Sequence, residues 1–351
     1  MTTSAIAPTA RKRIKTDDGF FLPEPTRLEK AVGPEWARVI RGLLTNPLSV
    51  TGLVVVAFFL AVAAAAPVLA PPAYANANPY LIPRDGFGPT PRDPGTEWAV
   101  RNAPPVPFWF ETVTGNQEWV HLLGTTSGQY DIFYGIVWGT RTALLVGVLV
   151  VGLTLFIGLI VGSISAYYGG LIDDLLMRVT EIFMAFPFLL AALTLTAILV
   201  PLFGRGIWPS VIALVSFGWM QYARVIRGDI LSTKERDYVL SARTVGAKDG
   251  TILLRHILPN AIFTTMVLAS LDVGAIVLTF AALSFLGVGT DIGYADWGQV
   301  ISFARSFILS LDTYWYIIVY PGLALVFFGL GWNLIGDGLR DVLDPRMRGK
   351  S

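Results

Sequence analysis

Long apolar runs alternate with polar segments along this chain, and the runs determine its predicted architecture. A helix that crosses a bilayer needs about 20 mostly apolar residues. The pattern therefore predicts an all-α polytopic membrane protein, with six transmembrane helices at about 48–69, 142–165, 182–200, 208–224, 258–287 and 314–335. The fourth of these runs, 208–224, is the weakest, because polar residues crowd its end.

Composition agrees with a membrane protein. Of the 351 residues, 54% are hydrophobic and only 15% are charged, whereas a soluble domain has about 25% charged residues. The lack of cysteine excludes a disulfide framework, a thiol nucleophile and a thiolate metal site. His121 and His256 are the two histidines. We expect no metal site, interpret His256 as structural, and expect His121 to pack in the outer segment or line an entrance.

An even number of spans places both termini on one side of the membrane. Twenty of the 26 Lys and Arg residues then fall on that side, and six fall on the other. Cytoplasmic loops carry the excess of basic residues, so both termini are expected in the cytoplasm. The first run is expected to remain a span, because the 47 residues before it exceed the short leader of a cleaved signal peptide.

The segment between the first two runs, residues 70–136, is long and rich in proline and aromatic residues, including Trp109 and Trp119. It is too apolar for a disordered linker. Two interpretations stay open at this stage. The segment either forms a small ordered cap on the external face or is a surface loop with some buried aromatic side chains.

A polar segment, residues 237–260, separates the fourth and fifth runs and reads DYVLSARTVGAKDGTILLRHILPN. A polar helix between two spans cannot lie in lipid. Thr233 is predicted to cap a helix over about 234–245, and Gly246 is predicted to end it in the left-handed conformation. The whole element is expected at about 234–250, projecting from the cytoplasmic end of the bundle.

Three apolar residues of this helix, Tyr238, Ala242 and Val245, are spaced to form one narrow stripe. Asp249 is predicted to cap a second short helix, and Pro259 to bend the chain because it donates no backbone hydrogen bond. The stripe fits a groove on a partner protein. The alternative is an ordinary connector that rests on the protein's own spans.

Asp272 is the charged residue nearest the centre of a predicted span. A carboxylate there costs roughly 2.5–3.5 kcal/mol on insertion scales. It is therefore expected to face a water-filled translocation path, where it would attract a cationic substrate group such as a peptide amino terminus, or to pair with a donor on a partner subunit.

The polar segment resembles the coupling motif of bacterial ABC-importer membrane subunits, approximately E-A-A-x-x-x-G followed by I-x-L-P. Leu240 replaces the usual glutamate, so a salt bridge from that glutamate is not expected, while docking still is. The matching residues are Ser241, Ala242, Arg243, Gly246, Ala247, Ile257, Leu258 and Pro259.

Other stretches resemble dipeptide and oligopeptide importer permeases of the OppC/DppC type, and the likeness runs from about residue 38 to 348 outside the long outer segment. This family usually has a glutamate where Phe280 stands. The stretches are 121–131 (an H-x-L-G-T-D-x-x-G-R-D entry with departures), 138–144, 283–298 (L-S-F-L-G-x-G…W-G), 320–324 and 333–346.

The resemblance implies a transport subunit rather than an enzyme, in a bacterial inner membrane. It implies a homologous permease partner, two cytoplasmic ATPases that bind ATP and magnesium, and an external substrate-binding protein. Peptides are the default substrate, with nickel chelates or oligosaccharides as alternatives. The residues expected to meet the ATPase are Tyr238, Ser241, Ala242, Arg243, Gly246, Ala247, Lys248 and Asp249.

The expected domains follow from this likeness. The importer transmembrane domain is expected at 137–340, between the outer segment and a cytoplasmic tail at 341–351, and residues 1–47 are expected to be cytoplasmic. The terminal Gly349-Lys350-Ser351 is not a phosphate loop, because Asp344 stands where the loop needs glycine. The competing functions are a secondary carrier or channel, which would need charge pairs or repeated broken helices, and a membrane scaffold.

Overall fold

The computed structural model describes residues 13–15, 21–23, 26, 29–30, 33–73, 76–99, 104–115 and 118–343. The basic residues at 11–12 and the tail at 344–351 lie outside the described residues. Helices dominate, and two antiparallel strand pairs accompany them. The pairs are β1 (Arg13–Lys15) with β2 (Phe21–Pro23), and β3 (Thr96–Glu97) with β4 (Val120–His121).

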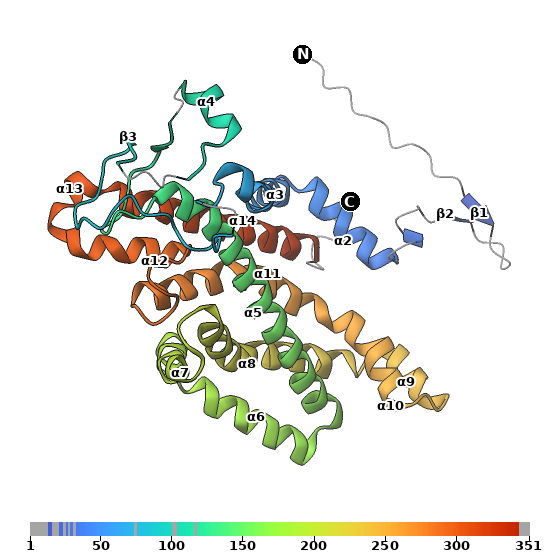
Figure 1. Cartoon of the computed structure of the whole chain (residues 1–351). Coiled ribbons are helices and arrows are strands. Elements are labelled where there is room, and N and C mark those ends of the chain that lie inside the picture. Colours follow the sequence, from blue (N-terminus) through green and yellow to red (C-terminus); the bar gives the residue numbers. More distant parts are fainter. Residues whose placement is uncertain are drawn as a thin grey trace.

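Long helices form the body of the molecule (Figure 1). α14 (Tyr316–Leu343) packs against both α3 (Pro47–Leu69) and α11 (Leu258–Phe285). α5 (Ile132–Tyr168) packs along α8 (Ile207–Thr233), and α11 contacts both of these helices. α11 therefore joins the two groups of helices, and it carries Asp272.

Aromatic side chains fill the centre of this body. The Phe59 ring of α3 lies 5.3 Å from Phe328 of α14 and 5.9 Å from Trp297, which begins α12 (Trp297–Ser302). α2 (Pro34–Thr45) precedes α3 and packs on α14. Asn46 separates these two helices, and its side chain caps α3 by accepting a hydrogen bond from the Leu48 N–H.

Two glycines let α5 and α8 approach closely. A Cβ atom built on Gly158 would lie 2.4 Å from the Cβ of Tyr222, and one on Gly162 would lie 2.3 Å from the carbonyl oxygen of Ala223. The four-residue spacing places both glycines on one face of α5, as in other close helix pairs of membrane proteins. This contact fixes the position of Tyr222 at the interface.

Among the described residues, four helices are long and apolar enough to cross a membrane: α3, α5, the helix over Asp249–Phe285 that includes α11, and α14. A fifth span results if α6 (Gly170–Met184) and α7 (Phe188–Phe203) count as one broken span. α8 contains the predicted fourth span but is not among them, and Gln221 and Arg224 are two of the polar residues it carries. Six spans therefore stay a prediction.

The second span is longer than the apolar pattern predicts. The pattern starts it at Thr142, but α5 begins at Ile132, because Asp131 caps the helix by accepting a hydrogen bond from the Tyr134 N–H at 2.7 Å. α5 thus begins inside the segment that the sequence assigns to the outer face, and where it enters the membrane stays a prediction.

The third span, predicted as one helix over 182–200, is broken. α6 and α7 meet at 84°, with Pro187 between them. Proline donates no backbone hydrogen bond and restrains the residue before it, which favours a break at this position. The charged residues of α6, which begins at Gly170, give no apolar signal by which the sequence could place this helix.

Residues 70–131, which we call the cap segment, contain the β3–β4 pair and α4 (Phe108–Thr114). Phe110 and Trp119 are buried, with ring centroids 4.9 Å apart, and Phe133 at the start of α5 lies 6.0 Å from Trp119. The cap segment thus packs its aromatic side chains against one end of α5.

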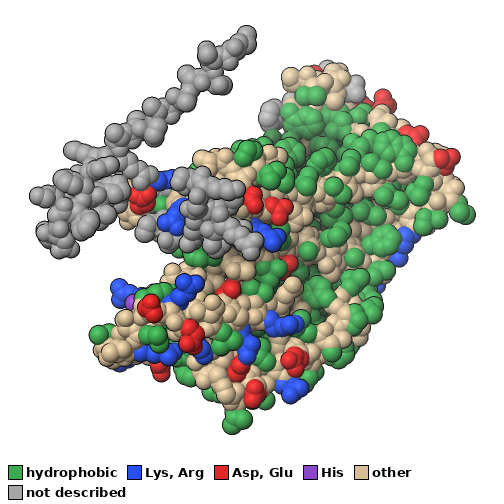
Figure 2. All heavy atoms as spheres, turned by 180° about the vertical axis from the view of Figure 1, so that it is seen from behind, with side chains coloured by type: hydrophobic (Ala, Val, Ile, Leu, Met, Phe, Trp, Pro, Cys, Tyr) green, Lys and Arg blue, Asp and Glu red, His purple; other side chains and the backbone are tan. Residues whose placement is uncertain are grey.

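Hydrophobic and charged side chains occupy different parts of the surface. Figure 2 shows hydrophobic side chains spread over much of the face. Lys, Arg, Asp and Glu gather along the lower part, which includes the lobe that carries α9 (Asp237–Thr244) and α10 (Asp249–Thr251), and further acidic side chains lie at the opposite end. Lipid-facing surface is apolar and charged loops lie in water. The charged lobe is therefore one water-exposed end of the molecule.

Candidate functional site

The segment predicted to couple to a partner consists of α9, a turn at Val245–Lys248 and α10, and we call it the coupling element. Gly246 has φ of +79°, the left-handed conformation that the sequence predicts. The Gly246 N–H donates to the Arg243 carbonyl, and the Ala247 N–H donates to the Ala242 carbonyl. These two bonds are the Schellman motif, in which glycine ends a helix.

The start of the coupling element differs from the prediction. Thr233 does not cap it, because α8 continues through Thr233, whose hydroxyl donates to the Asp229 carbonyl. α9 begins at Asp237, so the element is shorter than 234–250 implies, and Arg236 occupies the capping position. The second helix begins at Asp249, with Lys248 rather than Asp249 at its cap.

A π-helical turn, η1 (Ile252–Ile257), links α10 to α11 at the predicted Pro259 bend. In it, the Leu258 N–H donates to the Leu253 carbonyl, five residues earlier. The Asn260 side-chain amide donates to the His256 carbonyl. Pro259 donates no backbone hydrogen bond, and the wider π-helical turn lies directly before it. The coupling element therefore continues without a loop into the helix that carries Asp272.

The coupling element is fastened to the end of α5. The Tyr167 hydroxyl lies 2.6 Å from Asp249 Oδ1, and the Arg243 guanidinium lies over the Tyr167 ring. Lys234 Nζ donates to the Ala166 carbonyl at 3.0 Å. These contacts join three helices at one end of the molecule.

The sequence leaves open whether the apolar stripe fits a groove on a partner or rests on the protein's own spans, and the structure divides the stripe between the two. Ala242 packs on the protein's own helices beside Val239, which is fully buried. Tyr238 and Val245 are exposed, and Val245 keeps 84% of its surface in solvent. Ala247 is partly buried, whereas Ser241, Arg243, Gly246, Lys248 and Asp249 are exposed. The element therefore presents apolar and charged groups to a partner.

Asp272 lies in α11 at the edge of a cavity of about 390 Å³. The Tyr222 hydroxyl, from α8, donates to Asp272 Oδ2 at 2.7 Å. Sequence reasoning predicts a donor on a partner subunit as one alternative, and here a donor comes from the same chain. Nothing in the spacing of Tyr222 indicates this pairing, because the two residues meet only when α8 packs on α11.

A second cavity, of about 450 Å³, lies between α6 and α8 and is lined by charged residues apart from Met177. Arg227 pairs with Asp173 across it, with Nε 2.6 Å from Oδ1. Sequence reasoning misses this cleft, because α6 is not recognised as a helix. Its lining residues are Asp173, Asp174, Met177, Arg178, Glu181, Arg224 and Arg227.

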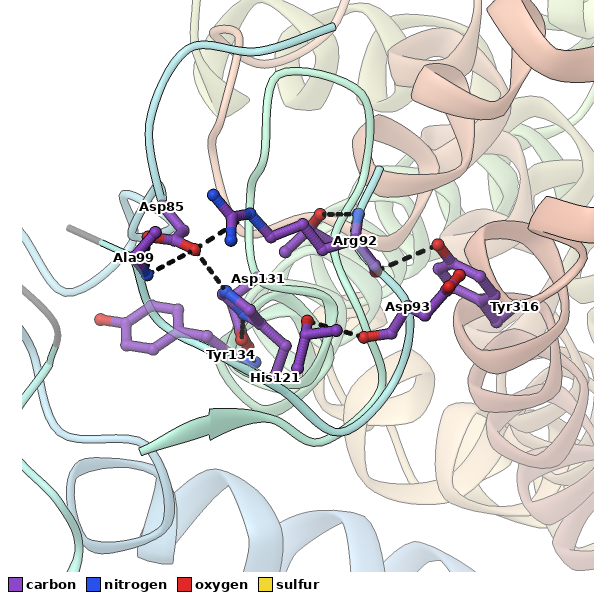
Figure 3. A network of polar contacts seen from close by, with 10 residues as sticks. Asp85, Arg92, Asp93, Ala99, His121, Asp131, Tyr134 and Tyr316 are labelled. Atoms are coloured by element: carbon purple, nitrogen blue, oxygen red, sulfur yellow. Dashed lines mark hydrogen bonds and ion pairs between the residues drawn. The ribbon is translucent and has the colours of Figure 1, made fainter. Parts of the chain in front are cut away.

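His121 joins two parts of the cap segment, one at Asp85 and one at Asp131, the residue that caps α5 (Figure 3). Its Nδ1 lies 2.8 Å from Asp131 and its Nε2 lies 3.2 Å from Asp85, and all three side chains are buried. Arg92 pairs with Asp85 at 3.1 Å, and the Trp98 ring lies against the imidazole. Both ring nitrogens thus face carboxylate oxygens within hydrogen-bond distance. His121 therefore packs in the cap, one of its two predicted positions.

Known proteins resemble this chain along most of its length. The family described as "Binding-protein-dependent transport system inner membrane component" matches residues 155–349, and "N-terminal TM domain of oligopeptide transport permease C" matches residues 35–105. In the solved structure of an amino acid ABC transporter, one chain aligns with a TM-score of 0.41 at 18% identity, covering 60% of this chain and 94% of its own.

Named relatives extend the match. The dipeptide transport system permease protein DppC of Alkalihalophilus pseudofirmus is 34% identical, with 93% of this chain and 94% of that protein covered. The oligopeptide transport system permease protein OppC of Bacillus subtilis is 37% identical over 65% of this chain and 72% of its own. The glutathione transport system permease protein GsiD of Pectobacterium atrosepticum is 36% identical over 69% of this chain and 78% of its own. The chain therefore belongs to the family of binding-protein-dependent transport system inner membrane components.

Proposed function

We propose that this chain is the permease subunit of an ATP-binding-cassette importer and forms half of a translocation path for peptides. The observation that carries the proposal is the 34% identity to a dipeptide permease over nearly the full length of both chains. Relatives named for oligopeptide and glutathione transport share the same region. A secondary carrier or a scaffold would account for neither this likeness nor the exposed coupling element.

The subunit works with partners. A homologous permease supplies the other half of the path, two cytoplasmic ATPases bind ATP and magnesium, and an external binding protein delivers the peptide. Six spans place both termini and the coupling element in the cytoplasm, where the basic residues are concentrated. The ATPases hydrolyse ATP, and this chain converts their movement into opening and closing of the translocation path.

Continuous helices connect the coupling element to the cavity beside Asp272. The coupling element lies between α8 and α11 in sequence, and it is tied to α5 through Tyr167 and Asp249. The same three helices line the Asp272 cavity, and the Tyr222–Asp272 bond joins two of them there. Asp272 stands 14 residues beyond the start of α11, about 21 Å along a helix. A displacement of the element thus reaches the walls of the cavity through continuous helices.

The test is co-purification of the subunit with the ATPases and second permease encoded beside it, followed by an ATPase assay. Wild type should bring down the ATPases. Gly246→Arg places a long side chain at a left-handed residue on the exposed turn, and it should reduce peptide-stimulated ATP hydrolysis at least tenfold while the subunit still inserts.

Gly250→Arg is the matched control. Gly250 lies in the same element, is exposed, and has open space around a built Cβ without a left-handed conformation. It should retain most of the coupling. If wild type associates with no ATPase, the importer function is wrong.

A further inference from the structure

The cavity beside Asp272 has two chemically different walls. One is apolar and aromatic and includes Met184, Phe186 and Phe188, which come from the break between α6 and α7, together with Phe217 of α8. The other is polar and includes Asp272, Tyr222 and Thr154. The 84° break thus turns apolar side chains toward a carboxylate, an arrangement that a straight third span would not provide.

The charge of Asp272 has no basic counterpart in this cavity. Among the described lining residues there is no Lys, Arg or His, and the polar ones besides Asp272 are Thr154, Gln221, Tyr222 and Thr279. The Tyr222 hydroxyl stabilises Oδ2 but leaves the net negative charge in place. A carboxylate in a partly apolar site favours a cationic ligand, because such a ligand replaces the lost hydration of the charge.

The cavity is also accessible. Met184, Phe186 and Gln221 are exposed on the surface of this subunit, so a ligand reaches the carboxylate without passing through the packed core. Its volume of about 390 Å³ falls within the range of small-ligand sites, roughly 300–1,000 Å³. A single carboxylate does not supply the several oxygen ligands that a divalent metal requires.

We propose that this cavity is a substrate subsite that binds the amino-terminal ammonium group of a peptide at Asp272, with an apolar first side chain against Phe186, Phe188 and Phe217. The inference rests on the proposed function, since the peptide is the transported solute. The ammonium donates to the carboxylate, while the aromatic rings remove the neighbouring side chain from water. The subsite selects for a free amino terminus next to an apolar residue.

The experiment is photo-crosslinking to the purified transporter complex without the binding protein, so that its selectivity does not intervene. The probe is p-benzoylphenylalanyl-alanine, compared with its N-acetyl form. In wild type, the free-amine probe should label residues 184–188 or 217–221, mapped by mass spectrometry. Labelling by the acetylated probe should be roughly tenfold to a hundredfold weaker, as expected for losing a hydrogen bond between charged groups.

Asp272→Asn keeps the shape of the side chain and the acceptor for Tyr222, but it removes the charge. It should abolish the difference between the two probes. Asp229→Asn removes a partly buried carboxylate of α8 that does not line the cavity, and it should leave the difference intact.

Equal labelling by both probes in wild type, or labelling elsewhere, overturns the subsite and needs no variant that might fold poorly. The failure of the subsite is separable from that of the proposed function. A complex that retains its ATPases and takes up peptide, yet shows no dependence on Asp272 or on the free amine, keeps the importer and loses the subsite.

Discussion

Single glycines in this protein have roles that depend on conformation, and Gly246 is the clearest. Its φ of +79° is strained for any residue with a Cβ, although open space surrounds it. Gly246→Ala should therefore destabilise the end of α9 by about 1–2 kcal/mol. Hydrogen exchange of the α9 amides should become roughly tenfold faster. Gly250→Ala, at an ordinary helical φ, should leave exchange unchanged or slower.

Gly162 must be small for the opposite reason, a lack of space rather than a backbone conformation. Here φ is helical, and the constraint is the Ala223 carbonyl, 2.3 Å from a built Cβ. Gly162→Leu should force α5 from α8 and lower stability by about 1–3 kcal/mol, measured as a drop in Tm of the detergent-purified subunit. Gly152→Leu on the same helix meets nothing within 4 Å. An equal loss in both variants would contradict the close-contact explanation.

At the scale of elements, the cap segment depends on a charged network. His121→Leu would leave Asp85 and Asp131 facing each other across an apolar side chain, and a buried polar group that loses its hydrogen-bond partner costs about 1–3 kcal/mol, more for a charged group. We expect the cap to open locally, so that limited proteolysis within 76–121 speeds up while α11 and α14 stay protected. His256→Leu, which removes the other histidine, should not affect cleavage of the cap.

The apolar pattern predicts some of these elements well and others poorly, for physical reasons. α3 is apolar along its length, and its pattern locates it at 48–69 against an observed Pro47–Leu69. α6 and α8 are packed against other helices and carry charges that pair internally, as Asp173 does with Arg227. Hydropathy therefore misses most of α6 and finds only the first part of α8, because it measures compatibility with lipid and not with a protein neighbour.

In the coupling element and the Asp272 cavity, too, local features are predictable from the sequence and contacts between helices are not. The Gly246 turn is predictable because a Schellman motif is local. Asp272 is conspicuous as a lone carboxylate in an apolar run. Tyr222 and the wall at Phe186 are not predictable in this way, because they depend on the packing of α8 on α11 and on the break at Pro187.

At the scale of the whole molecule, stability should depend on pH through Asp296, which caps α12. The carboxyl accepts hydrogen bonds from the Gly298 N–H at 3.1 Å and from Thr290, and burial raises its pKa from 3.8 to about 6. A raised folded-state pKa means that the protonated form is favoured on folding. The resulting stabilisation is complete below pH 3.8 and is lost as pH rises through 6.

Asp296→Asn keeps the capping oxygen without the charge. At pH 7.5 it should be more stable than wild type by up to about 3 kcal/mol, and the difference should disappear near pH 4. The measurement is Tm against pH in detergent. Asp291→Asn, exposed in the same loop, should follow wild type. A variant that is less stable than wild type at pH 7.5 would show that the ionised carboxylate is favoured in the fold.

The number of spans is also a property of the whole molecule, and the lack of native cysteine makes it measurable. Glu97 lies in the cap segment and Lys248 in the coupling element, and both are exposed. Between them run α5, the α6–α7 pair and α8. If all three cross the membrane, the crossings are odd in number and the two residues lie on opposite sides.

Single-cysteine variants Glu97→Cys and Lys248→Cys test this with a membrane-impermeant maleimide on intact spheroplasts. We expect Glu97→Cys to be labelled at once and Lys248→Cys only after permeabilisation. If α8 stays at the surface, or if α6 and α7 form a re-entrant loop, one crossing is lost and both cysteines react from the same side. Because parity changes with every lost crossing, the pair of labels separates six spans from five, which hydropathy cannot do. It also decides whether the coupling element reaches the compartment that holds ATP.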